Sequence, residues 1–204
     1  NSAGFYKKQF TLSKEEVTNR HNAIRFEGVY MNSAVWVNGT LAGQWKYGYG
    51  TFEFDISHLV KEGENQILVI AVYQNCNTRW YSGAGIFRDV TYINTPETFL
   101  ASHGSYVICR PDSCNHNFEN DIFAKESGLW KVDVETEVAC KNEIQDCFVK
   151  STLKDKNGKV IFQGTNVKPE FISKDETENL AKNVPVLEKC KILKSRENFS
   201  VENP

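Results

Sequence analysis

Apolar and polar residues alternate with a period of two along most of the chain. The alternation is clear in residues 22–30, 51–56 and 130–138. Because successive side chains of a β-strand point to opposite faces, this pattern predicts half-buried strands. Residues 66–73 are almost wholly apolar, which predicts a strand covered on both faces. The chain is therefore expected to be rich in β-structure.

Turn signals separate the predicted strands. Asn38-Gly39 lies between two apolar runs and predicts a tight hairpin, since both central residues of a type I′ turn need positive φ. Residues 155–158 predict another turn. Residues 57–63 predict one helical turn, with Ser57 as the N-cap and Gly63 as the C-terminal stop. Further strands are expected at residues 86–93, 104–109, 148–154, 159–162 and 185–193.

The spacing of these elements predicts the architecture. No segment of ten residues or more shows a convincing helical period, and many short strands separated by turns are typical of β-sandwiches. Pro96 and its polar neighbours mark the best domain boundary. We therefore expect two all-β sandwiches in tandem, residues 1–96 and 97–204, with residues 110–126 as a long loop.

Composition narrows the classes of function. The net charge is −2, which provides no basic field for nucleic acid or for anionic lipid. Apolar stretches fall short of the ~20 residues needed to cross a bilayer. The first residues lack the apolar core of a signal peptide. We expect no nucleic-acid or membrane partner and favour a cytoplasmic location, with secretion left open.

The six cysteines and four histidines show no metal-binding spacing. No C-x-x-C pair occurs, and no histidine lies at a zinc-like distance from a cysteine. We therefore predict no metal site and no cofactor. Reduced, mostly buried thiols are the favoured interpretation, and a disulfide between Cys140 and Cys147 across a hairpin is the alternative.

Five motifs follow one another in the first block. They are G-F-Y-K-K-Q-F at residues 4–10, R-F-E-G-V-Y-M-N-S with V-W-V-N-G at 25–39, F-E-F-D-I at 52–56, G-E-N-Q-I-L-V at 63–69 and R-W-Y-S-G-A-G-I-F-R-D-V at 79–90. In this order they resemble the sugar-binding domain of family 2 glycoside hydrolases, and of β-galactosidases above all. The resemblance implies a galactose-binding-like jelly-roll β-sandwich whose N-terminal strands are missing.

The second block resembles the immunoglobulin-like domain of the same family through residues 130–138, 149–160 and 202–204. The implied fold is thus an all-β jelly-roll followed by an immunoglobulin-like β-sandwich, truncated at its C-terminus. The family's two catalytic glutamates lie on a barrel of about 250 residues, for which this chain has no room. Asn142-Glu143 matches the family's Asn-Glu dipeptide, but it lies in a polar hairpin tip. We predict no catalytic residue here.

The loop at residues 75–81 is the candidate for sugar contact. Aromatic rings pack on the C–H face of a pyranose, while Arg and Asn side chains hydrogen-bond hydroxyl groups. By the family resemblance, Arg79 and Trp80 would reach toward the substrate at the barrel mouth, with Asn77 as a further candidate. In the structural alternative, Trp80 and Tyr81 plug the end of the sandwich and Arg79 pairs with an acidic residue. The second aromatic loop, residues 45–49, is expected to make an inter-domain contact.

These observations favour a non-catalytic accessory fragment of a retaining β-galactosidase-type enzyme. The fragment would pack on its own missing barrel, shape the rim of the site that binds a terminal β-galactoside, and be inactive alone. Homo-oligomerisation is left open. The alternatives are a free-standing carbohydrate-binding module, a β-glucuronidase or β-mannosidase fragment, and an adhesion module.

Overall fold

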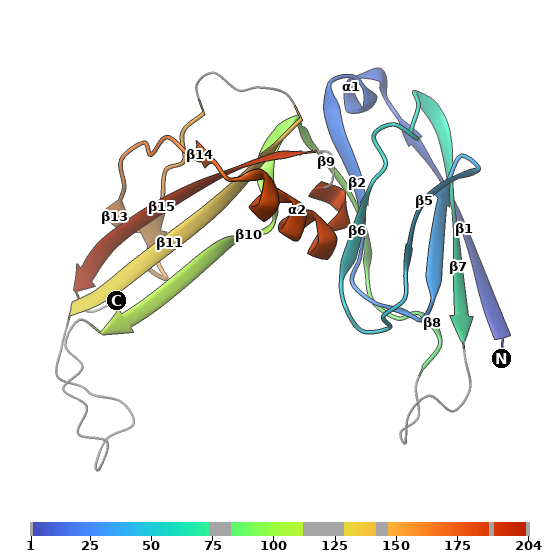
Figure 1. Cartoon of the computed structure of the whole chain (residues 1–204), viewed down its shortest axis with the longest axis horizontal. Coiled ribbons are helices and arrows are strands. Elements are labelled where there is room, and N and C mark those ends of the chain that lie inside the picture. The colour runs from blue at the N-terminus through green and yellow to red at the C-terminus, as the bar shows by residue number, and fades with distance from the viewer. Residues whose placement is uncertain (1, 74–82, 112–128, 142–146, 188–189, 203–204) are drawn as a thin grey trace, which may run out of the picture. The chain divides into compact units, whose positions relative to one another are not determined.

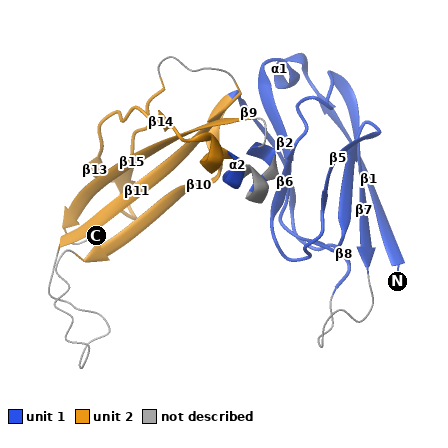
Figure 2. Ribbon diagram, viewed as in Figure 1, with its two compact units in different colours: residues 1–97, 178–189 blue, residues 98–177, 190–204 orange. Residues whose placement is uncertain are grey.

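The computed structural model describes residues 2–73, 83–111, 129–141, 147–187 and 190–202 (Figure 1). Strands dominate these residues, so the prediction of an all-β fold is confirmed. The chain divides into two compact units (Figure 2). Unit 1 comprises Asn1–Glu97 and Glu178–Lys189, and unit 2 comprises Thr98–Thr177 and Cys190–Pro204. The naming of residues 1–96 as a jelly-roll domain and 97–204 as an immunoglobulin-like domain stays a prediction.

Unit 1 is a β-sandwich. Its elements in chain order are β1 (Ser2–Leu12), α1 (Lys14–Val17), β2 (Arg20–Phe26), β3 (Val29–Tyr30), β4 (Ser33–Val37), β5 (Thr40–Trp45), β6 (Phe52–Asp55), β7 (Gly63–Tyr73), β8 (Gly85–Ile86) and β9 (Val90–Pro96), and later the 3₁₀ turn η1 (Pro185–Leu187). One sheet has the order β1-β7-β4-β5 and the other the order β6-β2-β9. The short strands β3 and β8 pair with each other.

The hairpin predicted at Asn38-Gly39 is confirmed. These two residues connect β4 to β5 and have φ angles of 50° and 84°. The amide group of Asn38 also stabilises the neighbouring loop, because its Nδ2 donates to Asn65 Oδ1 at 2.8 Å. Its Oδ1 accepts from the backbone N–H of Gln66 at 3.0 Å. The turn thus fixes the register of β4 against β7 as well as against β5.

The core of unit 1 lies between its two sheets. Val35, Val37 and Val69 reach it from the β1-β7-β4-β5 sheet and are buried. Phe26 and Phe52 reach it from the other sheet and stack with ring centroids 5.0 Å apart. Full burial of each such side chain contributes about 1.5–3 kcal/mol. Along β7, buried and half-buried residues alternate, so its second face is only partly covered.

The segment predicted as one half-buried strand at residues 22–30 differs from the prediction in two ways. It is divided into β2 and β3, and both faces of β2 are buried, including His21 and Ala23. The additional cover comes from far along the chain. Val186 and Leu187 of η1 are buried within unit 1, where η1 packs on β6, the neighbour of β2. Local alternation carries no signal for such a distant partner.

The helical turn predicted at residues 57–63 is present in part, but its ends differ from the prediction. The chain forms a turn in which the Ile56 carbonyl accepts from the N–H groups of Leu59 at 2.9 Å and Val60 at 3.1 Å. Ser57 is not an N-cap, because its hydroxyl donates to Asp55 Oδ1 at 2.5 Å and accepts from Asn22 N–H at 2.8 Å. Gly63 does adopt a positive φ of 85°, but it opens β7 rather than ending a helix.

Unit 2 is built on a twisted antiparallel sheet with the order β10-β11-β15-β14. Its elements are β10 (Thr98–Pro111), β11 (Leu129–Cys140), β12 (Thr152–Lys154), β13 (Val160–Gln163), β14 (Glu170–Phe171), α2 (Lys174–Asn183, shared with unit 1) and β15 (Lys191–Glu202). The predicted turn before β13 is present, and Gly158 has a φ of 84°. The strands expected at residues 104–109 and 130–138 are confirmed as parts of the longer β10 and β11.

The two faces of this sheet differ in chemistry. On one face Val132, Thr136 and Val138 are buried, as the alternation predicts. On the other face Lys194 lies 3.2 Å from Glu135 and 3.3 Å from Glu137. Burial lowers the pKa of Lys194, but the hydrogen bonds that its ammonium group donates to the Glu135 and Glu137 carboxylates outweigh this effect, so the pKa is raised. Ion pairs therefore link β11 to β15 on the solvent side.

Both helices were missed by the sequence prediction. Each begins with a capping box, in which a serine hydroxyl accepts from a backbone N–H three residues on and that residue's carboxylate accepts from the serine N–H. The pairs are Ser13 with Glu16 and Ser173 with Glu176. The strand predicted at residues 185–193 is also wrong at its start. The chain forms η1 first, and β15 begins at Lys191.

Cys140 and Cys147 lie in one apolar cluster with Val138 and Leu193. The two cysteines are free thiols in this structure and form no disulfide with each other. Cys140 is buried, and burial raises its pKa, with a further rise from Cys147 and an opposing effect of Lys191. Among the described cysteines, Cys140 and Cys190 are buried and Cys147 is half-buried, whereas Cys109 on β10 is exposed. Among the helices described, none has the length and apolarity to cross a membrane.

Candidate functional site

The predicted sugar-contact residues Arg79, Trp80 and Asn77 lie outside the described residues, as does Tyr81. The chain on both sides of them is described. β7 ends at Tyr73, and the chain resumes at Gly83 just before β8. The geometry of the candidate site is therefore built from the residues that flank this loop.

Five aromatic side chains gather where β7 ends and β8 begins. We call them the aromatic cluster: Tyr30, Tyr47, Tyr49, Tyr73 and Phe87. Tyr30 lies between two of the other rings, with its centroid 5.3 Å from that of Tyr49 and 6.3 Å from that of Tyr73. Tyr49 continues the contact to Tyr47 at 6.0 Å and to Phe87 at 6.2 Å. The cluster thus includes Tyr73, the last described residue before the candidate loop, and Phe87, which follows the loop.

Glycines allow the chain to bring these rings together. A Cβ atom at Gly48 would overlap the Tyr30 ring, and one at Gly28 would lie 2.6 Å from Cζ of Phe87. Backbone hydrogen bonds hold the same segments in place. Val72 N–H donates to the Met31 carbonyl at 2.9 Å, and Phe87 N–H donates to the Gly28 carbonyl at 3.2 Å. The backbone segments that carry the rings are therefore hydrogen-bonded to one another.

One member of the aromatic cluster is buried, and three are exposed to solvent. Tyr30 is 3% exposed, whereas Tyr47 is 63%, Tyr49 is 47% and Phe87 is 44% exposed. The guanidinium carbon of Arg88 lies 5.4 Å from the Phe87 ring centroid, which is a cation–π distance. Exposed rings beside a cation can bind the apolar face of a sugar or the surface of another domain. The loop at residues 45–49, predicted as an inter-domain contact, provides two of these rings, and that role stays a prediction.

Sequence reasoning missed Tyr30 and Phe87 as members of this cluster. Tyr30 looks like the apolar end of a strand, and Phe87 like part of a strand at residues 86–93. Both are placed by the short pairing of β3 with β8, in which Tyr30 lies opposite Gly85. The glycines at 28, 48 and 85 beside aromatic residues were the available signal, because they mark close approaches of backbone and ring.

Other candidate chemistry is limited. Asn142-Glu143 lies outside the described residues. Of the histidines, His21 is buried in unit 1, while His103 takes a φ of 57° in the irregular part of β10. Within the described ranges, no group of three or more His, Cys, Asp or Glu side chains could hold a metal ion.

Comparison with known proteins adds the family context. Residues 1–96 match the model of the sugar binding domain of glycosyl hydrolases family 2. A β-galactosidase of Bacteroides ovatus, BoGH2A, is 38% identical over 106 residues, which are 51% of this chain and 12% of that protein. A β-galactosidase of Priestia megaterium is 27% identical over 210 residues, covering all of this chain and 18% of its own length. The chain thus spans less than a fifth of these relatives.

A solved structure shows the same fold. A family 2 glycosyl hydrolase from Bacteroides cellulosilyticus superposes with a TM-score of 0.72 and 24% identity, over 99% of this chain and 24% of that one. The ordered motifs, the sandwich of unit 1 and the match to the family model agree. Through its residues 1–96, the chain belongs to glycosyl hydrolase family 2 as a sugar binding domain.

Proposed function

We propose that this chain is a non-catalytic part of a retaining β-galactosidase-type enzyme and shapes the rim of its sugar site. The observation that carries the proposal is the aromatic cluster. It anchors the chain on both sides of the loop with Asn77, Arg79 and Trp80, through Tyr73 before the loop and Phe87 after it. A loop carried on a rigid sandwich is a common place for binding residues.

The loop's residues suit a pyranose ligand. Trp80 would pack on the C–H face of the sugar, while Arg79 and Asn77 would hydrogen-bond its hydroxyl groups. These groups orient a substrate but do not cleave a glycosidic bond. Retaining hydrolysis needs two carboxyl groups about 5 Å apart, one as acid/base and one as nucleophile. We assign both to a barrel domain of the parent enzyme.

The rest of the chain has a supporting role in this proposal. Residues 97–204 would form the immunoglobulin-like sandwich, in which the β12–β13 pair packs on the apolar face of the β10-β11-β15-β14 sheet. The stack of Phe162 on Phe199 supports this packing. The exposed rings Tyr47 and Tyr49 would contact the catalytic barrel, which explains why a soluble unit carries them on its surface.

The test is an Arg79→Ala substitution in the full-length parent enzyme. We expect kcat/KM for a nitrophenyl β-galactoside to fall about tenfold or more, because a charged hydrogen bond contributes ~1.5–3 kcal/mol. Arg110→Ala is the matched control, since Arg110 is an exposed arginine of unit 2 that pairs with Asp133. Equal activity of the Arg79→Ala enzyme and its parent would refute the role of this loop.

A free-standing carbohydrate-binding module is the second candidate, favoured by the exposed rings of Tyr47, Tyr49 and Phe87. Titration calorimetry of the 204-residue chain with galactose and lactose distinguishes the two functions. Binding in the micromolar range that Tyr49→Ala abolishes would favour the module. Heats of dilution alone favour the accessory role. Parallel assays of the parent enzyme with β-glucuronide and β-mannoside substrates decide the sugar class.

A further inference from the structure

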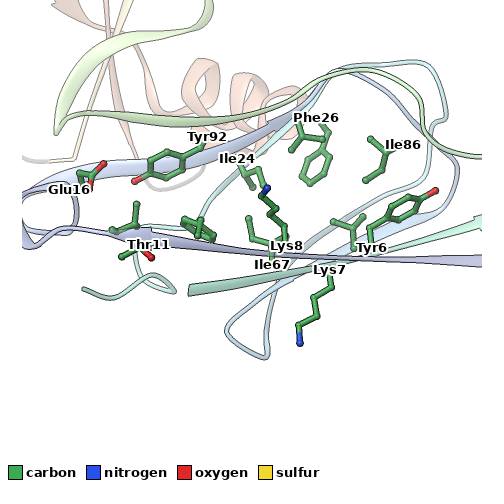
Figure 3. Close-up of a pocket in the computed structure, with 14 residues that line it drawn as sticks. Tyr6, Lys7, Lys8, Thr11, Glu16, Ile24, Phe26, Ile67, Ile86 and Tyr92 are labelled. Carbon is green, nitrogen blue, oxygen red and sulfur yellow. The ribbon is translucent and has the colours of Figure 1, made fainter. Parts of the chain in front are cut away.

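The apolar pocket of unit 1, between β1 and β9, contains no cysteine or histidine (Figure 3). Its volume is about 500 Å³, and Phe10, Ile24 and Ile67 are among the apolar residues that line it. At its polar end, the Tyr92 hydroxyl donates to Asn22 Oδ1. The nucleophilic side chains that the candidate site does not use lie elsewhere, because all four described cysteines belong to unit 2.

Two of these cysteines are neighbours. Cys140 and Cys147 belong to the same apolar cluster of unit 2. Six residues separate them along the chain. Cys140 is the last residue of β11 and is buried, whereas Cys147 is half-buried. Burial is the main cause that raises the pKa of Cys140, and Cys147 raises it further, so the two side chains are close enough to interact electrostatically.

Paired backbone carries both thiols. Cys140 lies opposite Lys191 in the β11–β15 ladder, and its Sγ donates to the Lys191 carbonyl at 3.5 Å. On the other side, Val149 follows Cys147 by two residues and exchanges two backbone hydrogen bonds with Val167, at 2.9 and 2.8 Å. A disulfide needs its two Cα atoms within about 7 Å of each other and correctly oriented side chains. Backbone held in this way favours such a bond.

The other described cysteines are less suitable partners for Cys140. Cys109 lies opposite Val132, eight residues before Cys140 on β11. Eight residues of a strand extend over ~27 Å, which is too far for a disulfide. Cys190 is buried, but it is not a member of the apolar cluster that contains Cys140 and Cys147. Of the described cysteines, Cys147 is therefore the partner that the packing favours.

We propose that Cys147 is a modification site for small-molecule disulfides such as oxidised glutathione, and that Cys140 converts the product into an internal disulfide. Cys147 is the point of entry because it is half-buried, whereas Cys140 is buried. The internal bond joins the end of β11 to the segment that leads through Val149 into β12. Oxidation thus connects the β10-β11-β15-β14 sheet covalently to the next part of unit 2.

The chemistry is two successive thiol–disulfide exchanges. The Cys147 thiolate attacks one sulfur of oxidised glutathione, which forms a mixed disulfide and releases one glutathione. The Cys140 thiolate then attacks the Cys147 sulfur, which forms the Cys140–Cys147 bond and releases the second glutathione. Two electrons pass from the protein thiols to glutathione, and the two thiol protons end on the released glutathione molecules.

The two steps differ in rate. Thiolate is the attacking species, and burial raises the pKa of Cys140, although Lys191 opposes this rise. Cys140 therefore forms little thiolate, and its attack is the slower step. The mixed disulfide on Cys147 should accumulate before the internal bond appears. This order of events distinguishes the proposed route from direct oxidation of the buried thiol.

The experiment incubates the reduced 204-residue chain with oxidised glutathione and determines the state of each cysteine by peptide mass spectrometry. We expect glutathione on Cys147 first and a Cys140–Cys147 disulfide later. Cys140→Ala should retain glutathione on Cys147, because nothing displaces it. Cys147→Ser should leave Cys140 modified at least tenfold more slowly. Cys109→Ser is the matched control, since it removes an exposed thiol of the same unit and should form the disulfide normally.

Thermal unfolding provides a second measurement. The disulfide closes a loop of eight residues, from Cys140 to Cys147, and restricts the unfolded chain. The oxidised chain should therefore melt about 5 °C or more above the reduced chain. Cys109→Ser should show the same rise, and Cys147→Ser should show none. Dithiothreitol should abolish the rise, because thiol–disulfide exchange is reversible.

Three results would overturn the proposal. The first is a disulfide that joins Cys140 to Cys190 or to any cysteine other than Cys147. The second is a wild-type chain in which Cys147 does not react or retains glutathione permanently. The third is a rise in melting temperature of the same size in Cys147→Ser. The proposal does not depend on the proposed function, since none of these measurements involves a sugar or the parent enzyme's activity.

Discussion

The Phe162 ring lies flat on the Phe199 ring, with centroids 3.7 Å apart and planes 7° from parallel. This contact joins the β12–β13 pair to β15 across the apolar face of unit 2. Both rings are half-buried, so each depends on the other for much of its cover.

Phe162→Ala should therefore destabilise unit 2 by about 2 kcal/mol, from lost apolar contact and lost ring stacking. Urea unfolding followed by circular dichroism measures the change. Phe171→Ala is the control, because Phe171 is 53% exposed, and it should change the stability by less than ~0.5 kcal/mol. Equal effects of the two substitutions would show that the stack does not stabilise the unit.

Gly48→Ala should destabilise unit 1 by ~1–3 kcal/mol, because the added methyl group overlaps the Tyr30 ring at the base of the aromatic cluster. Thermal unfolding should show a melting temperature lower by several degrees. Gly83→Ala is the comparison, since a Cβ atom there meets nothing within 4 Å. A Gly48→Ala protein as stable as Gly83→Ala would mean that Tyr30 moves aside freely and does not anchor the cluster.

The capping box of α1 predicts a pH dependence. Hydrogen bonds that the Ser13 backbone N–H and hydroxyl donate to the Glu16 carboxylate hold the pKa of Glu16 below its ordinary value. A lowered folded-state pKa stabilises the fold above the unfolded pKa, and this stabilisation is lost as the pH falls through the folded value. Wild type should therefore unfold at a higher urea concentration than Glu16→Gln at pH 7, and this difference should shrink as the pH falls below the usual range of a glutamate pKa.

Glu15→Gln, one residue earlier in the same turn, serves as the control and should show a smaller gap at pH 7. Glu176→Gln should repeat the behaviour of Glu16→Gln at α2, because Ser173 lowers the Glu176 pKa in the same way. A gap between wild type and Glu16→Gln that stays constant from pH 7 to pH 3 would exclude the carboxylate as its cause.

The cysteines should differ in reactivity. Cys109 is exposed, whereas Cys140 is buried and burial raises its pKa, so less reactive thiolate forms at Cys140. Alkylation by iodoacetamide at pH 8, mapped by peptide mass spectrometry, should label Cys109 about tenfold faster or more. Labelling of the two at similar rates would mean that β11 opens readily at its Cys140 end.

The sequence predicted the strands wherever the local pattern is sufficient to define them. The Asn38-Gly39 turn and the alternation from Trp130 to Val138 depend on nearby residues alone, and both are confirmed. The helices were missed because α1 has only four residues and α2 is polar at most of its positions. Ser173 and Glu176 form a capping signal that is visible in the sequence but carries no helical period.

The site was harder to predict because its parts are distant in sequence. Tyr30, Tyr49 and Phe87 meet only after β3 pairs with β8 and the loop after β5 folds back. The loop motif around Arg79 follows the end of β7 at which Tyr73 joins the aromatic cluster. The roles of Asn77, Arg79 and Trp80 stay predictions for the Arg79→Ala experiment.

The buried pair Val186 and Leu187 has a consequence for synthesis of this protein. Because η1 belongs to unit 1, the ribosome must make about ninety residues beyond Glu97 before the first unit has all of its parts. Contacts between such distant residues slow folding, since the intervening chain must close a long loop. A polypeptide stopped after Glu97 would leave β6 without the apolar cover of η1, so expression of the first sandwich alone should yield a less stable and more aggregation-prone product.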